Sequence, residues 1–286
     1  MTAGTLTPKA RSRDWLFGGL IAALAVILLP KLWLSDTPLY TRLLTPTCLI
    51  VVTGASKLLF LVAAAVAASG VARAFGRRNP AGAGWTFLAV GLGAYAVAQA
   101  ILVWYQSVLR VPSPYPSLAD PLFVLGMLLL VWALWSLLHA YTRGEWPLAS
   151  DGEVARLAAI VALPILALGA WLLRPVFEHP APVIEELLNI TYPILDCALL
   201  VPTFILARIT SRLRGGEMHR VWTLLLAGCL CTAVGDVAFS YVSTLGMKQL
   251  DPLVHLLFCA SYALWAWGAA LQRDVARAPR ETLPAG

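Results

Sequence analysis

The sequence predicts an all-α membrane protein, a polytopic bundle of eight transmembrane helices arranged as two parallel four-helix repeats. Of its 286 residues, 59% are hydrophobic and only 13% are charged, about half the charged share of an ordinary globular domain. The mean hydropathy is +0.77. The apolar runs are long and unbroken, as in membrane-spanning helices, whereas a membrane β-barrel alternates apolar and polar residues. This composition excludes a soluble enzyme, a nucleic-acid-binding module and a disordered chain.

Eight segments are long and apolar enough to cross a bilayer as helices. They are Trp15–Leu34, Cys48–Gly70, Gly84–Gln106, Asp120–Ala140, Val154–Leu173, Leu187–Arg208, Val221–Ser243 and Pro252–Leu271. The first segment follows three cationic residues and could pass for a signal peptide. Because no small-residue cleavage site follows it, we interpret it as an uncleaved anchor.

The distribution of lysine and arginine predicts that both termini are cytoplasmic. With the N-terminus inside, one side of the membrane collects 15 of the 21 cationic residues and the other side five, while Lys57 lies within a span. Such an excess marks the cytoplasmic side. Arginine far outnumbers lysine, 17 to four, and alanine is abundant, which indicates a GC-rich bacterium. We therefore expect a multi-pass protein of the bacterial cytoplasmic (inner) membrane.

The two halves of the chain resemble each other, which predicts two equivalent units, residues 15–142 and 143–272, between cytoplasmic tails 1–14 and 273–286. The matching positions are Trp85 with Trp222, Gln99 with Asp236, Asp120 with Asp251 and Lys57 with Asp196. Because each half holds four spans, both have the same orientation, which defines a parallel repeat. Repeat interfaces hold ligand sites in many transporters, but a repeat can also be only a packing unit.

Polar side chains are rare within the predicted spans, where a charged residue costs about 2.5–3.5 kcal/mol, and they gather toward the outer side. The candidate ligand-binding or switch residues are Lys57, Gln99, Asn189, Tyr192, Asp196, Asp236 and His255. At about 1.5 Å per residue, these lie between the midplane and the outer surface. They predict a polar pocket that opens to the periplasm and is closed below. A buried ion pair of Lys57 with Asp196 or Asp236, which only fixes helix packing, is the alternative.

Prolines mark two further features. Pro193 and Pro202 lie on either side of Asp196 and each removes a helix hydrogen bond, which predicts a kink that either moves or simply shapes the bundle. Asp120 and Asp251 each precede a proline at the start of an apolar run. Aspartate as the N-cap with proline at the first helical position is a helix-start signal, so we interpret both as helix caps.

The sequence predicts no cofactor, no metal site and no catalytic residues. The five cysteines lie within or beside apolar runs without ligand spacing, and the four histidines are scattered. An intramembrane enzyme that uses the aspartates as an acid pair and His255 as a base is a weaker alternative. One cytoplasmic loop is a candidate docking surface, through Arg208, Arg212, Arg214 and Arg220. The alternative is that these arginines only set the orientation of the protein in the membrane and contact anionic lipids.

Four short motifs carry a resemblance to a known family. They are Pro114–Asp120, Tyr192–Asp196, Gly235–Tyr241, and Asp251–Leu253 followed by Tyr262. Over about residues 85–270, they resemble the multi-helix membrane sensor region at the N-terminus of bacterial signalling proteins. In that family the region precedes diguanylate cyclase, cyclic-di-GMP phosphodiesterase or histidine kinase domains. Gln99 stands where the family often has an acid. Only a short tail follows Leu271, so the resemblance implies a sensor without its output domain.

Together these features favour an integral membrane sensory or partner subunit. We expect it to bind a small or lipidic ligand in the periplasm-facing pocket and to relay to a separate membrane or cytoplasmic protein. Membrane lipids are its other expected partners, and nucleic acid is excluded. A small-molecule transporter is one alternative: the repeat and the kinked helix favour it, whereas the lack of polar groups in the inner half opposes it. A structural subunit of a membrane complex is the other alternative.

Overall fold

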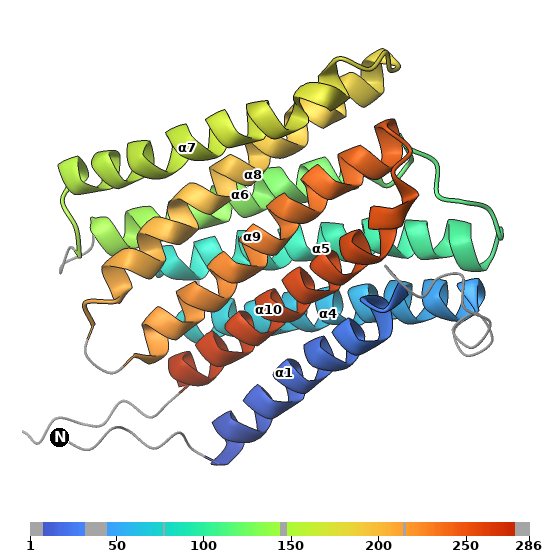
Figure 1. Cartoon of the computed structure of the whole chain (residues 1–286). Coiled ribbons are helices and arrows are strands. Elements are labelled where there is room, and N and C mark those ends of the chain that lie inside the picture. The colour runs from blue at the N-terminus through green and yellow to red at the C-terminus, as the bar shows by residue number, and fades with distance from the viewer. Residues whose placement is uncertain (1–7, 32–44, 77, 144–147, 214–215, 278–286) are drawn as a thin grey trace, which may run out of the picture.

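Every regular element of the protein that the structure describes is a helix. The computed structural model describes residues 8–31, 45–76, 78–143, 148–213 and 216–277. The helices are α1 (Pro8–Leu28), α4 (Pro46–Phe75), α5 (Pro80–Ser107), α6 (Asp120–Thr142), α7 (Asp151–Phe177), α8 (Val183–Thr210), α9 (Glu217–Thr244), the short η1 (Lys248–Leu250) and α10 (Asp251–Arg277). The long helices lie side by side and alternate in direction (Figure 1). The all-α prediction is confirmed.

Local sequence explains where several helices begin. Pro46 and Pro80 stand at the first positions of α4 and α5, where a missing N–H costs nothing. The Thr45 hydroxyl and the Asn79 amide oxygen accept hydrogen bonds from the free N–H groups of these first turns, at 3.2 and 2.9 Å. The Ser150 hydroxyl caps α7 in the same way, at 3.3 Å. Such caps satisfy donors that have no partner within the helix.

Seven helices, α4 to α10, are long and apolar enough to cross a membrane, and each contains one of the predicted spans. The protein is therefore a multi-pass helical membrane protein. The described part of α1 differs, because its first seven residues include Lys9, Arg11, Arg13 and Asp14. Its uncharged part before the helix ends at Leu28 is shorter than the roughly 20 residues that a span needs. The end of the predicted first span, residues 32–34, lies outside the described residues.

Six of the helices form a closed ring. In order, α4 packs against α5, α5 against α6, α6 against α8, α8 against α9, α9 against α10, and α10 against α4. The two remaining long helices lie outside this ring, α1 against α10 and α7 against α8 and α9 (Figure 1). The ring therefore brings α4 beside α10, although these helices are far apart in the sequence.

Small residues let neighbouring helices of the ring approach closely. A Cβ atom on Gly91 of α5 would lie 3.0 Å from the Gly126 carbonyl oxygen of α6. A Cβ atom on Gly228 of α9 would lie 2.3 Å from Cδ1 of Trp265 on α10. Close backbone contact of this kind is the common way in which membrane helices gain packing energy without a hydrophobic driving force.

The two ends of the ring differ. We call one the cavity end, formed by loops 108–119 and 245–250, and the other the arginine end, where α4, α6 and α8 end and α5, α7 and α9 begin. At the arginine end, Asp14 of α1 accepts from Trp267 Nε1 at 2.9 Å and pairs with Arg220 at 2.6 Å. The Phe17 ring stacks on Trp267, with centroids 5.9 Å apart. These contacts fix α1 against the ring.

Candidate functional site

A cavity of about 1030 Å³ opens at the cavity end of the ring. Its lining comes from all six ring helices, from loop 108–119 and from Lys31. Along α10 the lining runs from Asp251 in the first turn to Tyr262, eleven residues further on, which is a depth of about 16 Å at 1.5 Å per residue. The cavity therefore reaches about halfway through a hydrocarbon core of roughly 30 Å.

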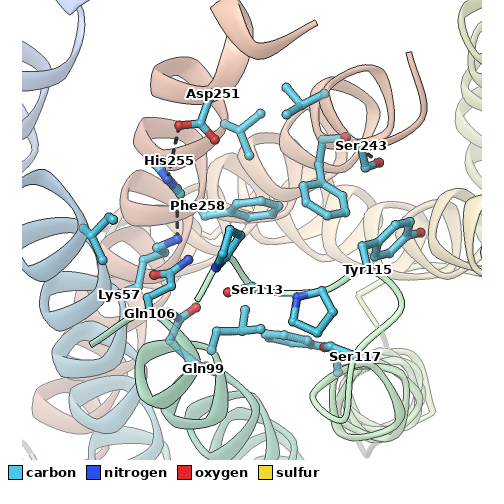
Figure 2. A pocket seen from close by; sticks show the side chains of 18 of the residues that line it. Lys57, Gln99, Gln106, Ser113, Tyr115, Ser117, Ser243, Asp251, His255 and Phe258 are labelled. Atoms are coloured by element: carbon cyan, nitrogen blue, oxygen red, sulfur yellow. Dashed lines mark hydrogen bonds and ion pairs between the residues drawn. The ribbon is translucent and has the colours of Figure 1, made fainter. Parts of the chain in front are cut away.

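Most of the polar residues singled out from the sequence converge on this cavity. Five of the seven candidates line it, namely Lys57 of α4, Gln99 of α5, Tyr192 of α8, Asp236 of α9 and His255 of α10. Figure 2 shows Lys57, Gln99 and His255 along one wall. The other two candidates, Asn189 and Asp196, are buried in α8 behind the lining, 2% and 4% exposed.

Lys57 is 7% exposed and belongs to a row of titratable groups on α4, on α10 and at Lys31, three residues after the end of α1. Its Nζ lies 3.2 Å from Nδ1 of His255, as Figure 2 shows. The second ring nitrogen, Nε2, lies 3.6 Å from the Asp251 carboxylate, which is 3.9 Å from Lys31 Nζ. Asp251 is the first residue of α10, so a helix does start where it was predicted, but no side-chain capping hydrogen bond of Asp251 is found among the described residues, and its carboxylate lies beside Lys31 and His255.

The ion pair that the sequence suggested for Lys57 is absent from the described residues. Lys57 lies within 4.0 Å of neither Asp196 nor Asp236. The cause is the order of helices in the ring, because α4 has α5 and α10 as neighbours, whereas the two aspartates lie on α8 and α9. The expectation of a Lys57–aspartate pair with these residues is therefore wrong.

Asp196 and Asp236 instead lie close enough to interact with each other across α8 and α9. Asp236 lines the cavity, whereas Asp196 is buried and its Oδ1 has no hydrogen-bond partner among the described residues. Two carboxylates this close repel each other when both are ionised. The pair therefore places acidic side chains on α8 and α9, on the side of the ring away from α4, with Asp236 lining the cavity and Asp196 behind it.

Asp120 joins the loop at the mouth of the cavity to α8. It begins α6, but Ala119 holds the N-cap position and makes no side-chain cap, which corrects the cap prediction. The Asp120 carboxylate instead accepts from the Ser117 N–H at 2.6 Å, the Ser117 hydroxyl at 2.9 Å and the Tyr192 hydroxyl at 2.9 Å. The carboxylate is therefore directed toward the preceding loop and α8, where these three donors lie.

Asn189 links the same loop to α9. Its Oδ1 accepts from the Tyr115 hydroxyl at 3.0 Å, and its Nδ2 donates to Thr244 Oγ1 at 3.2 Å. Burial, and then the carboxylates of Asp120 and Glu185, raise the pKa of the Tyr115 phenol. Tyr115 therefore remains a protonated donor. Tyr115 lies in one of the family-like motifs but was not predicted as a site residue.

Aromatic rings close the cavity below. The sequence analysis named only one of them, Tyr262, as part of a family-like motif and not as a site residue. Tyr95, Tyr262 and Trp265 contact one another with centroids 5.7–6.1 Å apart. We call these three residues the aromatic floor. Beneath it, leucines fill the ring around a void of about 20 Å³. Further toward the arginine end, the buried rings of Trp85 and Trp222 meet at 6.3 Å. The half of the ring below the floor is therefore packed.

The arginines predicted as a docking surface are partly engaged within the protein. Arg212 pairs with Glu153 and donates to the Leu148 carbonyl oxygen at 3.3 Å, and Arg220 pairs with Asp14. Arg208 is exposed and donates to the Ser211 hydroxyl at 3.3 Å. Arg214 lies outside the described residues. The Arg212 contacts join the end of α8 to the start of α7, and the Arg220 contact joins α9 to α1.

The described residues contain no group of three or more His, Cys, Asp or Glu side chains that could hold a metal ion. All five cysteines are free thiols, and three of them, Cys197, Cys229 and Cys259, are buried. The polar groups that line the cavity are hydroxyl, carboxyl, amide, imidazole, amine and guanidinium groups.

The fold and the site define a class, a multi-pass helical membrane protein with a polar cavity that opens at one end of a six-helix ring. Comparisons with protein-family models, curated proteins and solved structures give no match.

Proposed function

We propose that the protein is a membrane-embedded receptor, a sensory or partner subunit that binds a small or lipidic ligand in its cavity and relays to a separate protein. One observation carries this proposal. The cavity enters the ring from one end, collects polar side chains from several helices, and stops at the aromatic floor above a packed lower half. A receptor needs a binding site of this form, whereas a passage through the membrane needs a continuous polar path.

We propose further that the ring consists of two parallel repeats, α4–α6 and α8–α10, and that α1 is an eighth span. The packing of α4, α5 and α6 recurs in α8, α9 and α10, and the α6–α8 contact corresponds to the α10–α4 contact. Trp85 and Trp222, equivalent in the repeat, meet each other, as residues beside a twofold axis do. The outer helices α1 and α7 pack differently, α1 against α10 and α7 against α8 and α9.

The lining of the cavity also follows the repeat, which supports a binding site at the repeat interface. Four positions on one face of α5 match four on α9 at a constant shift of 137. These lining pairs are Tyr95 with Thr232, Gln99 with Asp236, Leu102 with Phe239 and Gln106 with Ser243. On α6 and α10, Asp120 and Phe123 match Asp251 and Val254. Both halves would therefore contact a single ligand.

We place the cavity mouth on the periplasmic side of the bacterial cytoplasmic membrane, with both termini cytoplasmic. The excess of arginine and lysine in the connections at the arginine end supports this orientation. The resemblance to sensor regions supports a relay to a protein partner at that end. Arg208 is the exposed cation of the 208–220 segment that pairs with no described carboxylate, so we assign it to partner or anionic-lipid contact.

A transporter is the second candidate, because Pro193 and Pro202 lie inside α8 on either side of Asp196. Prolines within a helix free carbonyl groups and allow bending. A helix that bends beside the cavity could open the packed lower half. The two functions differ in whether the lower part of the cavity is ever reached from the arginine end.

Cysteine accessibility distinguishes the two functions. In a cysteine-free background, Ser243→Cys lies near the mouth, Phe258→Cys deeper in the cavity, and Leu92→Cys below the floor. Each variant is reconstituted in vesicles of known orientation and treated with a membrane-impermeant maleimide from either side. The receptor predicts that the first two react from one side only and that Leu92→Cys reacts from neither. Reaction of Phe258→Cys from both sides would instead show alternating access and support transport.

A further inference from the structure

We infer that the cavity binds an anionic amphiphile, with its acidic head group on Lys57 and its apolar body above the aromatic floor. This inference rests on the proposed receptor function and adds the chemistry of the ligand. Three features carry it. Lys57 lacks an anionic partner, cations line the mouth, and part of the cavity lining is apolar and aromatic.

Lys57 is buried without an anion. Its Nζ has one hydrogen-bond partner, a histidine nitrogen, and lies 6.0 Å from the Phe258 ring centroid. No carboxylate of the described residues lies within 4.0 Å of it. An ammonium group has three hydrogens to donate, and a buried charge is costly unless it is paired. A carboxylate or phosphate in the cavity would supply both the missing charge and the missing acceptors.

His255 acts as a positioning residue for this ammonium group. Because an ammonium group can only donate, Nδ1 of His255 is the acceptor. The ring hydrogen then lies on Nε2, which faces the Asp251 carboxylate at 3.6 Å. This arrangement holds Lys57 at the wall between α4 and α10 and leaves two of its hydrogens for a ligand.

The nearby carboxylates do not compete for Lys57. Asp120 already accepts three hydrogen bonds, and Asp251 lies beside His255 and Lys31. The remaining acidic pair lies on α8 and α9, which are not neighbours of α4 in the ring. That pair would repel an acidic head group from the opposite wall, so the ligand would have one favoured orientation.

The mouth and the floor fit the two parts of such a ligand. Three cations, Lys31, Arg110 and Lys248, line the cavity near its mouth, and cations there attract an anion into a low-dielectric cleft. Deeper in the cavity, aromatic side chains of the lining, Phe258, Tyr262 and Tyr95, offer surface for an apolar body beside the polar side chains of Gln99 and Asp236. The volume of about 1030 Å³ lies at the upper end of the range for small-molecule sites.

Binding of octanoate tests the inference. The protein is placed in phosphatidylcholine nanodiscs, and radiolabelled octanoate is measured by equilibrium dialysis against protein-free nanodiscs. We expect saturable binding that unlabelled octanoate displaces and that octyltrimethylammonium, with the same chain and the opposite charge, does not. Lys57→Met is expected to weaken binding about tenfold to a hundredfold, the worth of a hydrogen bond to a charged group, and Lys57→Arg to retain it. Arg174→Met, which removes an exposed cation outside the cavity lining, should change affinity less than about fivefold.

Each outcome is decisive. Equal binding by the wild type and Lys57→Met overturns the assignment to Lys57. Binding of octyltrimethylammonium but not octanoate overturns the anionic ligand and leaves the receptor intact. If octanoate, octyltrimethylammonium and octanol all fail to bind specifically, the proposed receptor function is overturned as well. The comparison of the two probes needs only the wild type, so it holds even if a variant fails to fold. Displacement of octanoate by oleate in the bilayer indicates a lipid source, and its failure a water-soluble acid.

Discussion

The hydroxyl of Tyr192 is expected to hold the loop at the cavity mouth through Asp120. Tyr192→Phe removes one oxygen atom and keeps the ring. The Asp120 carboxylate has three hydrogen-bond donors. It then loses the Tyr192 hydroxyl of α8, which lies 2.9 Å from its Oδ1, and keeps the two donors of Ser117. The change therefore removes the hydrogen bond between α8 and the start of α6, and it leaves the hydrogen bonds between Ser117 and Asp120 in place.

The size of the effect follows from the burial and charge of this contact. Interhelical hydrogen bonds in membrane proteins contribute about 0.6 kcal/mol on average, with a maximum near 1.7 kcal/mol. A bond to a carboxylate is roughly twice as strong as a neutral one. Asp120 is 8% exposed, so water screens the contact little. We expect a coupling free energy between Tyr192 and Asp120 of about 1.2–1.7 kcal/mol.

A double-mutant cycle measures this coupling. The free energy of unfolding is determined by SDS titration from mixed micelles for the wild type, Tyr192→Phe, Asp120→Ala and the double variant. Tyr105→Phe is the matched control, because the Tyr105 hydroxyl makes no hydrogen bond with the described residues. A coupling below about 0.3 kcal/mol, the ordinary error of additivity, would refute the reasoning.

Two further predictions use the same unfolding measurement. Gly228→Ala places a Cβ 2.3 Å from Trp265, so we expect a loss of about 1–3 kcal/mol from overpacking. Gly93→Ala meets nothing within 4 Å and should be neutral or slightly stabilising, and an equal loss in both would contradict the packing argument. Asp196→Asn should cost under about 1 kcal/mol, because its neighbour is another carboxyl. A loss of about 3–5 kcal/mol, typical of a broken buried ion pair, would instead require a cation beside Asp196.

The helices could be predicted from the sequence because each is a long apolar run, and long apolar runs form helices in a membrane. The neighbours of each helix could not. The partner of Lys57 depends on α10 closing the ring against α4, a contact between the two ends of the chain. The sequence pattern does not show which of the other helices packs against α4. For this reason the suggested Lys57–aspartate pair was wrong.

The polar part of the site was predictable because polar side chains in apolar runs are conspicuous. The aromatic floor was not, because Tyr95 and Tyr262 read as ordinary apolar-core residues in an apolar helix. One signal could have identified part of it. The lining positions 95, 99, 102 and 106 lie on one helical face, and the repeat maps them onto lining positions of α9. A search for shared faces in the two halves would have included Tyr95.

The proposed repeat explains why the charges inside the bundle separate onto opposite walls. Lys57 and Asp196 occupy matching positions of the proposed repeat, on α4 and α8, and these two helices are not neighbours in the ring. Each then contacts an adjacent helix, Lys57 with His255 on α10 and Asp196 with Asp236 on α9. The first contact leaves a cation beside the cavity and the second an acid. Under the proposed repeat, a symmetric scaffold would hold an asymmetric pocket, in which the proposed charged ligand would bind in one direction only.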